Sequence, residues 1–382
     1  MSFKKSKISS LVLMALAAIA FLAIIYYANY DRPVYRSSDT SGTDYEVGRV
    51  VRVLENNVVV DETSEGIWRG SMKLEVEILS GRYKGDTAIV ENYFSSLYNV
   101  RVLEGDKVSI RIDTVDKGEY QVSVYNYYRV PQMIGCIVAF IALLVIVGGK
   151  KGVKSVAGLV FTMVSVIWIL LPLSLKGFPP LLVTIVLILL CNFVCFFLID
   201  GIRKKTVVAA LGSVCGVLAG AVFALIAQAA MSVTTYQMDE AEVLLLITST
   251  TSLTVKDLFL CGILISCMGA VMDVAMSIVS AISEIHEVNP SMDAKGLFRS
   301  GMNIGRDAMG TMSNTLILAF VGSSFNMMLM IYSYDVSFQQ LMNTDFVAIE
   351  AIQCIAGSVG IVCTVPIAAF IAAEVFGKRK KN

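Results

Sequence analysis

Long apolar blocks separated by short polar segments make up most of the chain, and this pattern predicts helices that cross a membrane. An α-helix rises about 1.5 Å per residue, so roughly 20 apolar residues cross the hydrocarbon layer of a bilayer, which is about 30 Å thick. The blocks have about this length and almost no charge. We therefore expect about eight transmembrane helices, at residues 8–28, 132–148, 153–173, 179–199, 207–231, 257–282, 309–334 and 347–376.

Residues 31–129 follow a second pattern, in which polar and apolar residues alternate at period two. Turn signals such as Lys84-Gly85 and Glu104-Gly105-Asp106 separate these runs, which lie at 47–54, 73–78, 88–91, 108–112 and 120–125. Five or six short strands predict a small antiparallel all-β domain, for which an OB-like barrel fits best. The predicted fold is thus a polytopic α-helical membrane protein with an N-terminal transmembrane anchor at 1–30, this β domain at 31–129 and a seven-helix membrane domain at 130–382.

The first apolar block has two interpretations. It follows Lys4, Lys5 and Lys7, as the apolar centre of a cleaved signal peptide would. It is long for such a centre, however, and it ends in Tyr26-Tyr27, where the aromatic belt of a spanning helix would lie. We favour an anchor that is not cleaved.

Positive charge in the short linkers predicts the orientation of the helices. Cytoplasmic loops of membrane proteins are enriched in lysine and arginine. Apart from Lys256, which lies directly before the block at 257–282, the alternate loops hold Lys176 as their basic residue, together with acidic residues such as Asp335 and Asp345. We therefore expect a multi-pass protein of the cell membrane with both termini in the cytoplasm and residues 31–129 outside it. The basic linker residues are Lys150, Lys151, Lys154, Arg203, Lys204, Lys205, Lys295, Arg299, Arg306, Lys378, Arg379, Lys380 and Lys381.

Composition argues against several classes of function. Hydrophobic residues make up 56% of the chain and charged residues only 16%, which departs from soluble domains. The β domain holds 13 Lys and Arg against 17 Asp and Glu, so it lacks the basic surface of an OB fold that binds nucleic acid. His286 is the single histidine. No motif for catalysis, a cofactor or a metal site occurs, so we expect no enzyme.

Small residues in the block 207–231 predict close helix packing. Gly212, Gly216 and Gly220 recur every four residues and so share one helix face. Small residues on one face allow two membrane helices to approach closely. We expect these glycines to serve packing.

Two polar rows mark the candidate functional site. Asp273 is the one charge deep in a predicted span, and Ser266, Gly269, Ser277, Ser280 and Glu284 share its helix face. The next helix carries a similar row, and Arg299 and Arg306 lie near it as possible countercharges. If the rows face each other, they form a polar cleft open to the cytoplasm. The pathway candidates are Asp273, Ser277, Ser280, Glu284, Asn303, Arg306, Asp307, Thr311 and Asn314.

The linker between these helices predicts a separate short element. Asn289 and Pro290 fit the N-cap and first position of a helix. We expect a short helix over about 292–305 that lies on the membrane surface, before the spanning segment at 309–334.

The same region carries a family resemblance. The stretches 269–277, Asn289-Pro290, 297–307 and 310–316 resemble the YibE/F-like family of bacterial multi-helix membrane proteins. The resemblance is specific over 257–325 and extends from about 130 to the end. It implies a longer, YibE-type member with an outer domain, whose partners would be the lipid bilayer and either a YibF-like membrane protein or further copies of itself. It supplies no substrate.

Two hypotheses for the function remain open. The first is a secondary transporter, exporter or permease that uses the polar cleft between the sixth and seventh predicted helices. The second is a scaffold or sensor whose outer β domain binds an envelope ligand or partner.

Overall fold

The computed structural model describes residues 16, 18–33, 42–63, 66–114, 119–201, 203–238 and 241–377. The chain forms two compact units. The β unit comprises Arg36–Leu143, and the helical unit comprises Met1–Tyr35 together with Leu144–Asn382. The β unit is therefore an insertion between the first helix and the remaining helices.

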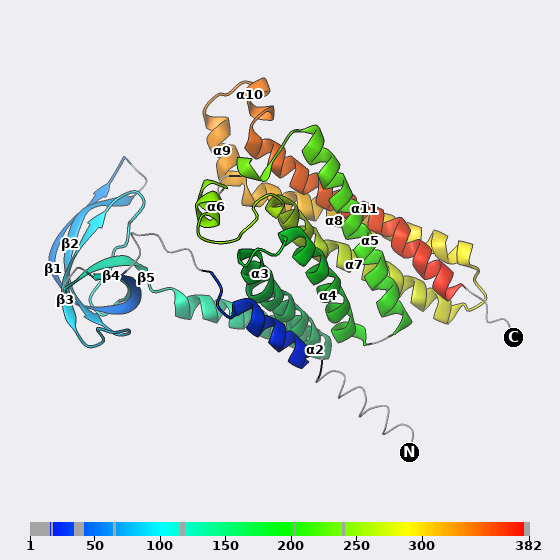
Figure 1. The fold of residues 1–382 in the computed structure, drawn as a ribbon, viewed down its shortest axis with the longest axis horizontal. Coiled ribbons are helices and arrows are strands. Elements are labelled where there is room, and N and C mark those ends of the chain that lie inside the picture. Colours follow the sequence, from blue (N-terminus) through cyan, green and yellow to red (C-terminus); the bar gives the residue numbers. More distant parts are fainter. Residues whose placement is uncertain are drawn as a thin grey trace, which may run out of the picture. The chain divides into compact units, whose positions relative to one another are not determined.

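Five antiparallel strands form the β unit, drawn in blue to teal in Figure 1. Their order in the sheet is β3-β2-β1-β4-β5, and the outer strands β3 and β5 also contact each other, so the sheet curls into a half-barrel. Each expected run of alternating residues lies within one strand. The strands are β1 (Thr43–Asp61), β2 (Ile67–Ile78), β3 (Thr87–Phe94), β4 (Lys107–Thr114) and β5 (Tyr120–Tyr127).

The long first strand joins the two halves of this sheet. β1 pairs with β4 from Thr43 to Arg49 and with β2 from Gly48 to Asp61, with two register irregularities near Val50 and Val53. Such irregularities bend a strand and increase its twist. One strand can therefore serve both halves of the half-barrel.

The core of the β unit comes from the apolar positions of the alternating pattern. Leu74, Val76, Ile110 and Val108 are fully buried, while the charged residues between them point outward. At the edge of the core, the hydroxyl of Tyr120 donates to the Asp86 carboxylate at 3.0 Å, and burial raises the pKa of Tyr120.

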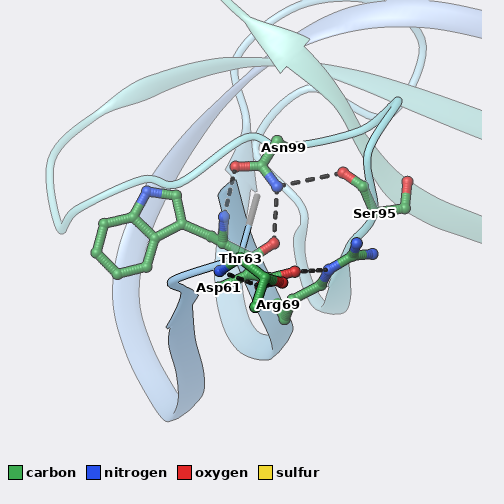
Figure 2. A network of polar contacts seen from close by, with 6 residues as sticks. Asp61, Thr63, Arg69, Ser95 and Asn99 are labelled. Atoms are coloured by element: carbon green, nitrogen blue, oxygen red, sulfur yellow. Dashed lines mark hydrogen bonds and ion pairs between the residues drawn. The ribbon is translucent and has the colours of Figure 1, made fainter. Parts of the chain in front are cut away.

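A polar network ties the loop after β3 to the start of β2 (Figure 2). The Asn99 amide donates to the carbonyls of Trp68 and Ser95 at 2.8 and 3.2 Å, and its oxygen accepts from the Trp68 backbone N–H. Beside it, Arg69 forms an ion pair with Asp61 at 3.1 Å. The Arg101 guanidinium lies 4.0 Å from the centre of the Trp68 ring, a cation–π contact that also orders this loop.

A sharp turn interrupts the long helix that follows the strands, whose residues up to Leu143 belong to the β unit and whose later residues belong to the helical unit. The residues of α2 (Val130–Ser165) form two helical segments, because Gly149 has φ 53° and ψ −132° and Gly152 lies against the Leu144 carbonyl. A π-helical turn (Val166–Leu170) and the short α3 (Leu171–Leu175) follow. The break lies between the two spans expected at 132–148 and 153–173.

The short apolar helix Ala18–Asn29 is held against this second segment. The Phe21 and Phe161 rings stack at 4.7 Å, and the Asn29 amide donates to the Trp168 carbonyl at 2.9 Å. The Lys176 ammonium donates to the Tyr30 carbonyl at 2.6 Å. The N-terminal helix is thus part of the helical unit.

Four long apolar helices form the body of this unit (Figure 1). α7 contacts α4, α5, α8 and α11, and α11 also packs on α5 and α8. Within the described residues, these four and the segment Val130–Leu175 are long and apolar enough to cross a membrane. The four are α4 (Pro180–Asp200), α5 (Lys204–Ala230), α7 (Leu258–Val288) and α11 (Asp345–Phe376).

A bent pair of helices gives one further candidate span. α8 (Ala294–Ser323) and α9 (Phe325–Ser333) meet at 60°, and together they are long and apolar enough to cross a membrane. The short helices α6 (Ala241–Thr248) and α10 (Phe338–Met342) connect the longer ones.

The prediction for the linker before α8 was wrong. Asn289 is the C-cap of α7, and α8 begins after Asp293, whose carboxylate accepts from the Gly296 N–H at 3.0 Å. The expected surface helix over 292–305 is instead the first half of α8. It continues because Gly301 and Gly305 allow the helix to lie directly on α7 and α11, so that packing holds this part in the bundle.

Candidate functional site

The exposed face of α7 is polar, and its buried face is apolar. From Leu258 to Glu284, every exposed residue is glycine, serine, aspartate or glutamate. Apart from Ser283, the buried residues, such as Leu264, Val271 and Ile278, are apolar and pack against the neighbouring helices. We call the exposed set the α7 row, which comprises Gly262, Ser266, Gly269, Asp273, Ser277 and Glu284, with half-buried Ser280 beside it.

The neighbouring helices show the opposite arrangement. The exposed residues of α4 are all large and apolar, for example Leu182, Val186 and Phe193. The exposed residues of α5 beyond its first turn are also apolar, for example Leu211 and Leu218. This is the surface that lipid covers in a membrane protein. The α7 row therefore stands out from the rest of the helical unit.

The first two-thirds of α8 expose a second polar face. Gly301 and Gly305 lie against α7 and α11, where added Cβ atoms would meet Ile282, Ile278, Ala369 and Val365. The opposite face, from Lys295 to Thr315, exposes only charged residues, polar residues and glycine. This face, the α8 row, comprises Lys295, Arg299, Asn303, Arg306, Asp307, Gly310, Thr311, Asn314 and Thr315.

The two rows do not face each other across a cleft within the chain, so that geometric expectation was wrong. The contact between α7 and α8 runs through Ile278 and Ile282 on one side and Gly305 and Gly301 on the other. Asp273 and the α8 row lie on the far sides of their helices from this contact. Apolar and small residues form the contact between α7 and α8 because they allow the two helices to pack closely. The polar residues of both helices therefore lie on the outer surface.

Asp273 also lacks the countercharge that the sequence led us to expect. Among the described residues, no hydrogen bond or ion pair involves the Asp273 carboxylate or the guanidinium groups of Arg299 and Arg306. On α8, Thr311 bonds only to its own helix, with its hydroxyl donating to the Ala308 carbonyl at 3.0 Å. The described part of the chain therefore leaves the charged groups Asp273, Arg299 and Arg306 available to something outside it.

A cavity of about 350 Å³ lies at the end of the α7 row. It brings the predicted residues Ser280 and Glu284 together with the basic start of α5, where Lys205 forms an ion pair with Asp200 at 3.1 Å. Sequence reasoning used these basic residues only for orientation. The sequence signal that could have placed these basic residues at the site was their position directly before a long apolar helix. The lining residues are Arg203, Lys204, Lys205, Ser280, Ser283, Glu284, Glu287 and Phe376.

His286 lies beside this cavity and does not extend it into a metal site. Its ring centre lies 6.2 Å from that of Phe376, and its Nδ1 atom is buried without a hydrogen-bond partner. Within the described part of the chain, no group of three or more His, Cys, Asp and Glu side chains could hold a metal ion.

The glycines of α5 lie where α5 crosses α11. Gly212 faces Ala368, Gly216 faces Thr364 and Gly360, and Gly220 faces Ala356 and Gly360. All three glycines are buried. This crossing lies away from the polar rows and holds the bundle on which the α7 row is displayed.

Comparison with known proteins supplies a family and no relative of known activity. A family model described as YibE/F-like protein matches residues 136–378, which include all of α4, α5, α7, α8 and α11. No curated protein and no solved structure matches the chain.

Proposed function

Since the chain belongs to the YibE/F-like family, we propose that it is an integral membrane protein with eight spans. Five candidate spans and the bent pair α8–α9 support this count. The turn at Gly149 divides Val130–Leu175 into two spans, and the helix Ala18–Asn29 is the end of the first one.

The proposed orientation places both termini in the cytoplasm and the five-stranded sheet of the β unit outside. The basic starts of α5 and α8 and the cavity beside Glu284 all lie at the same end of α7 as the turn into α8. A concentration of Lys and Arg at one end of a bundle is the property by which cytoplasmic loops are recognised. We also propose that the sheet of the β unit is an OB-like barrel that is open between β3 and β5. Its strand order, β3-β2-β1-β4-β5, supports this assignment.

We propose further that the protein moves an ion or a small polar substrate along the α7 row. The observation that carries this proposal is the unbroken polar face of α7, which leads from the cytoplasmic cavity at Glu284 and Ser280 to Asp273, deep in the span. Polar and ionisable groups within spanning helices commonly mark ion and substrate pathways.

Energetics favour a pathway over a structural role for Asp273. An ionised carboxylate at the centre of a spanning helix costs about 2.5–3.5 kcal/mol on the insertion scale. A hydrogen bond between membrane helices returns on average only about 0.6 kcal/mol. Among the described residues, Asp273 makes no such bond. Asp273 therefore costs free energy and stabilises no contact inside the described part of the chain. A role in contacting water and a transported species explains its position better.

Labelling of a cysteine on the α7 row tests the proposed pathway. We expect a Ser277→Cys variant, with the eight native cysteines replaced by alanine, to react with a membrane-impermeant maleimide in inverted vesicles. The reaction should also lower the flux of sodium, potassium or protons, measured with ion-sensitive dyes. The reason is that Ser277 lies between the cavity and Asp273, where water must reach it.

Leu211→Cys is the matched control for this labelling. Leu211 is 52% exposed and lies about two turns along α5 from Lys205, whereas Ser277 lies about one turn along α7 from Ser280, so both positions lie in the half of their helix that is nearer the cavity. It belongs to an apolar surface, so it should stay unlabelled and leave the flux unchanged. Equal labelling of the two variants would contradict a pathway along the α7 row.

A cavity on the β unit supports the alternative function, a sensor or scaffold that binds an envelope ligand. This cavity of about 270 Å³ is lined by Tyr98, Tyr125, Tyr127, Asn99 and Arg129, among others. Tyr98 and Tyr125 are exposed there, and aromatic side chains with polar tips are enriched at binding surfaces.

Binding to cell-wall polymer tests this alternative. If it holds, the full chain in detergent should sediment with isolated bacterial sacculi, and Tyr98→Ala should lower the retained fraction several-fold because it removes exposed ring area from the cavity. Ile89→Ala is the control, because Ile89 is as exposed on the same unit but does not line the cavity. Retention that is absent, or equal in both variants, would count against the alternative.

A further inference from the structure

The α7 and α8 rows leave a polar surface on the outside of the helical unit. α4 and α8 cover the two sides of α7, and the α7 row lies between them. The α8 row lies on the neighbouring helix and also points outward. Lipid tails offer no partner for carboxylate, guanidinium and amide groups, so another protein surface or water must cover these rows.

We propose that a second copy of this chain covers this surface, with α7 of each copy facing α8 of the other. The two rows of one chain would then meet the two rows of its partner, and the polar cleft would form between copies. This inference rests on the membrane placement proposed above, and it also supplies the second wall that the transport pathway lacks.

The contacts inside one chain establish which residues of the rows lie at the same depth. α7 and α8 run antiparallel, with Ile282 beside Gly301 and Ile278 beside Gly305, and further along Gly357 of α11 contacts both Leu316 and Cys267. A step of four residues toward the N-terminus of α7 therefore covers the same depth as a step of four residues toward the C-terminus of α8. This register pairs Glu284 with Arg299, Ser280 with Asn303, Ser277 with Arg306, Asp273 with Gly310 and Gly269 with Asn314.

A two-fold axis along the membrane normal preserves depth, so each residue meets groups at its own level in the partner. Most homo-oligomers have such closed symmetry, and a two-fold interface joins the same surface patch of both copies. The α7 row of one copy therefore faces the α8 row of the other with the register that holds inside a single chain.

Charges at matching depths are complementary. The charges of the α7 row are acidic, Asp273 and Glu284, whereas the α8 row carries Arg299 and Arg306. Glu284 is level with Arg299. Arg306 lies about one helical turn, roughly 6 Å, from the level of Asp273, which an extended arginine side chain can reach. Asp307, on the same row as Arg306, moderates the positive charge without removing it.

Small residues in the rows permit a close approach of the two copies. Cβ atoms added at Gly262 and Gly269 of α7 or at Gly310 of α8 would meet nothing within 4 Å. These glycines therefore have no packing role inside the chain, in contrast to Gly301 and Gly305. Glycine on an open helix face allows a second helix to pack closely.

Disulfide cross-linking between two differently tagged copies tests the proposal. Both copies lack the native cysteines, and one carries Gly269→Cys while the other carries Asn314→Cys. We expect oxidation in membranes to give a covalent pair that contains both tags, because the proposed register places these positions opposite each other. Leu189→Cys replaces Gly269→Cys in the control, because Leu189 is exposed on α4 at a similar depth, next to Ile188, which shares a cavity with Met268.

A charge exchange tests the same interface without cysteines. Glu284→Arg or Arg299→Glu alone should lower the dimer fraction several-fold, and the double variant should restore it. The proposal is overturned if the mixed pair forms no faster than the Leu189 control, if the double variant does not recover, or if the cross-link joins the chain only to a different membrane protein. If the dimer forms but no ion flux is measured, the dimer inference stands and the transport proposal fails. If alkali extracts the chain from membranes, the chain is not an integral membrane protein and both proposals fail.

Discussion

A Gly216→Leu variant is expected to accumulate at less than about a tenth of the wild-type level, because it separates the two helices that hold the bundle. Even a methyl group at this position would collide with the Thr364 hydroxyl and lie 3.1 Å from the Gly360 carbonyl. Overpacking in a well-packed core costs typically about 1–3 kcal/mol, and here the obstacle includes backbone that no side-chain rotation can clear.

Size-exclusion chromatography of a fluorescent fusion in mild detergent, followed by a thermal melt, measures this effect. Gly216→Ala should fall between the wild type and Gly216→Leu. Gly322→Leu is the control, because a Cβ at Gly322 would meet nothing within 4 Å. A monodisperse Gly216→Leu protein with unchanged melting temperature would show that α5 and α11 do not depend on this contact.

An Asp273→Asn variant is expected to lose at least about nine-tenths of the ion flux and to keep or raise its thermal stability. The amide has nearly the same shape as the carboxylate, but it cannot carry the charge or the exchangeable proton that the proposed pathway uses. It also avoids much of the roughly 2.5–3.5 kcal/mol cost of a charge at the centre of a span. A loss of flux with a gain of stability distinguishes a functional carboxylate from a structural one.

Proteoliposomes with an internal pH-sensitive dye and imposed sodium or potassium gradients provide the measurement. Asp345→Asn is the control, because Asp345 begins α11 and lies outside both rows. Unchanged flux in Asp273→Asn would remove this carboxylate from the mechanism. Unchanged flux together with a lower melting temperature would indicate a structural role in its place.

Sequence reasoning located the elements well where one physical rule dominates. Alternation at period two placed the five strands, because a half-buried sheet requires it. The length of apolar runs placed α4, α5, α7 and α11 within a few residues. The helix over 292–305 was predicted to be a separate surface element because Asn289 and Pro290 fit a helix start and apolar residues such as Leu297 could rest on the membrane. The sequence alone did not reveal that Gly301 and Gly305 would bind this segment into the bundle.

The candidate site was identified by residue but not by geometry. Spacing correctly grouped Ser266, Asp273 and Ser277 on one face of α7, since helical periodicity determines which residues share a face. It could not show where that face points. This depends on which surfaces of α7 the neighbouring helices cover, and close packing of residues such as Ile278 against Gly305 decides it.

The N-terminal helix has a consequence for biosynthesis. Asn29 contacts Trp168 and Tyr30 contacts Lys176, so the contacts of this helix join residues 139 and 146 positions apart. Ribosomes add about 5–20 residues per second, so this helix waits roughly 7–30 seconds for its partners to be made. During that interval the five strands of the β unit are synthesised, and in the proposed topology they are also translocated. If this proposed topology holds, the first helix remains in the bilayer alone during that interval, so its hydrophobicity has to suffice for insertion without help from the bundle it later joins.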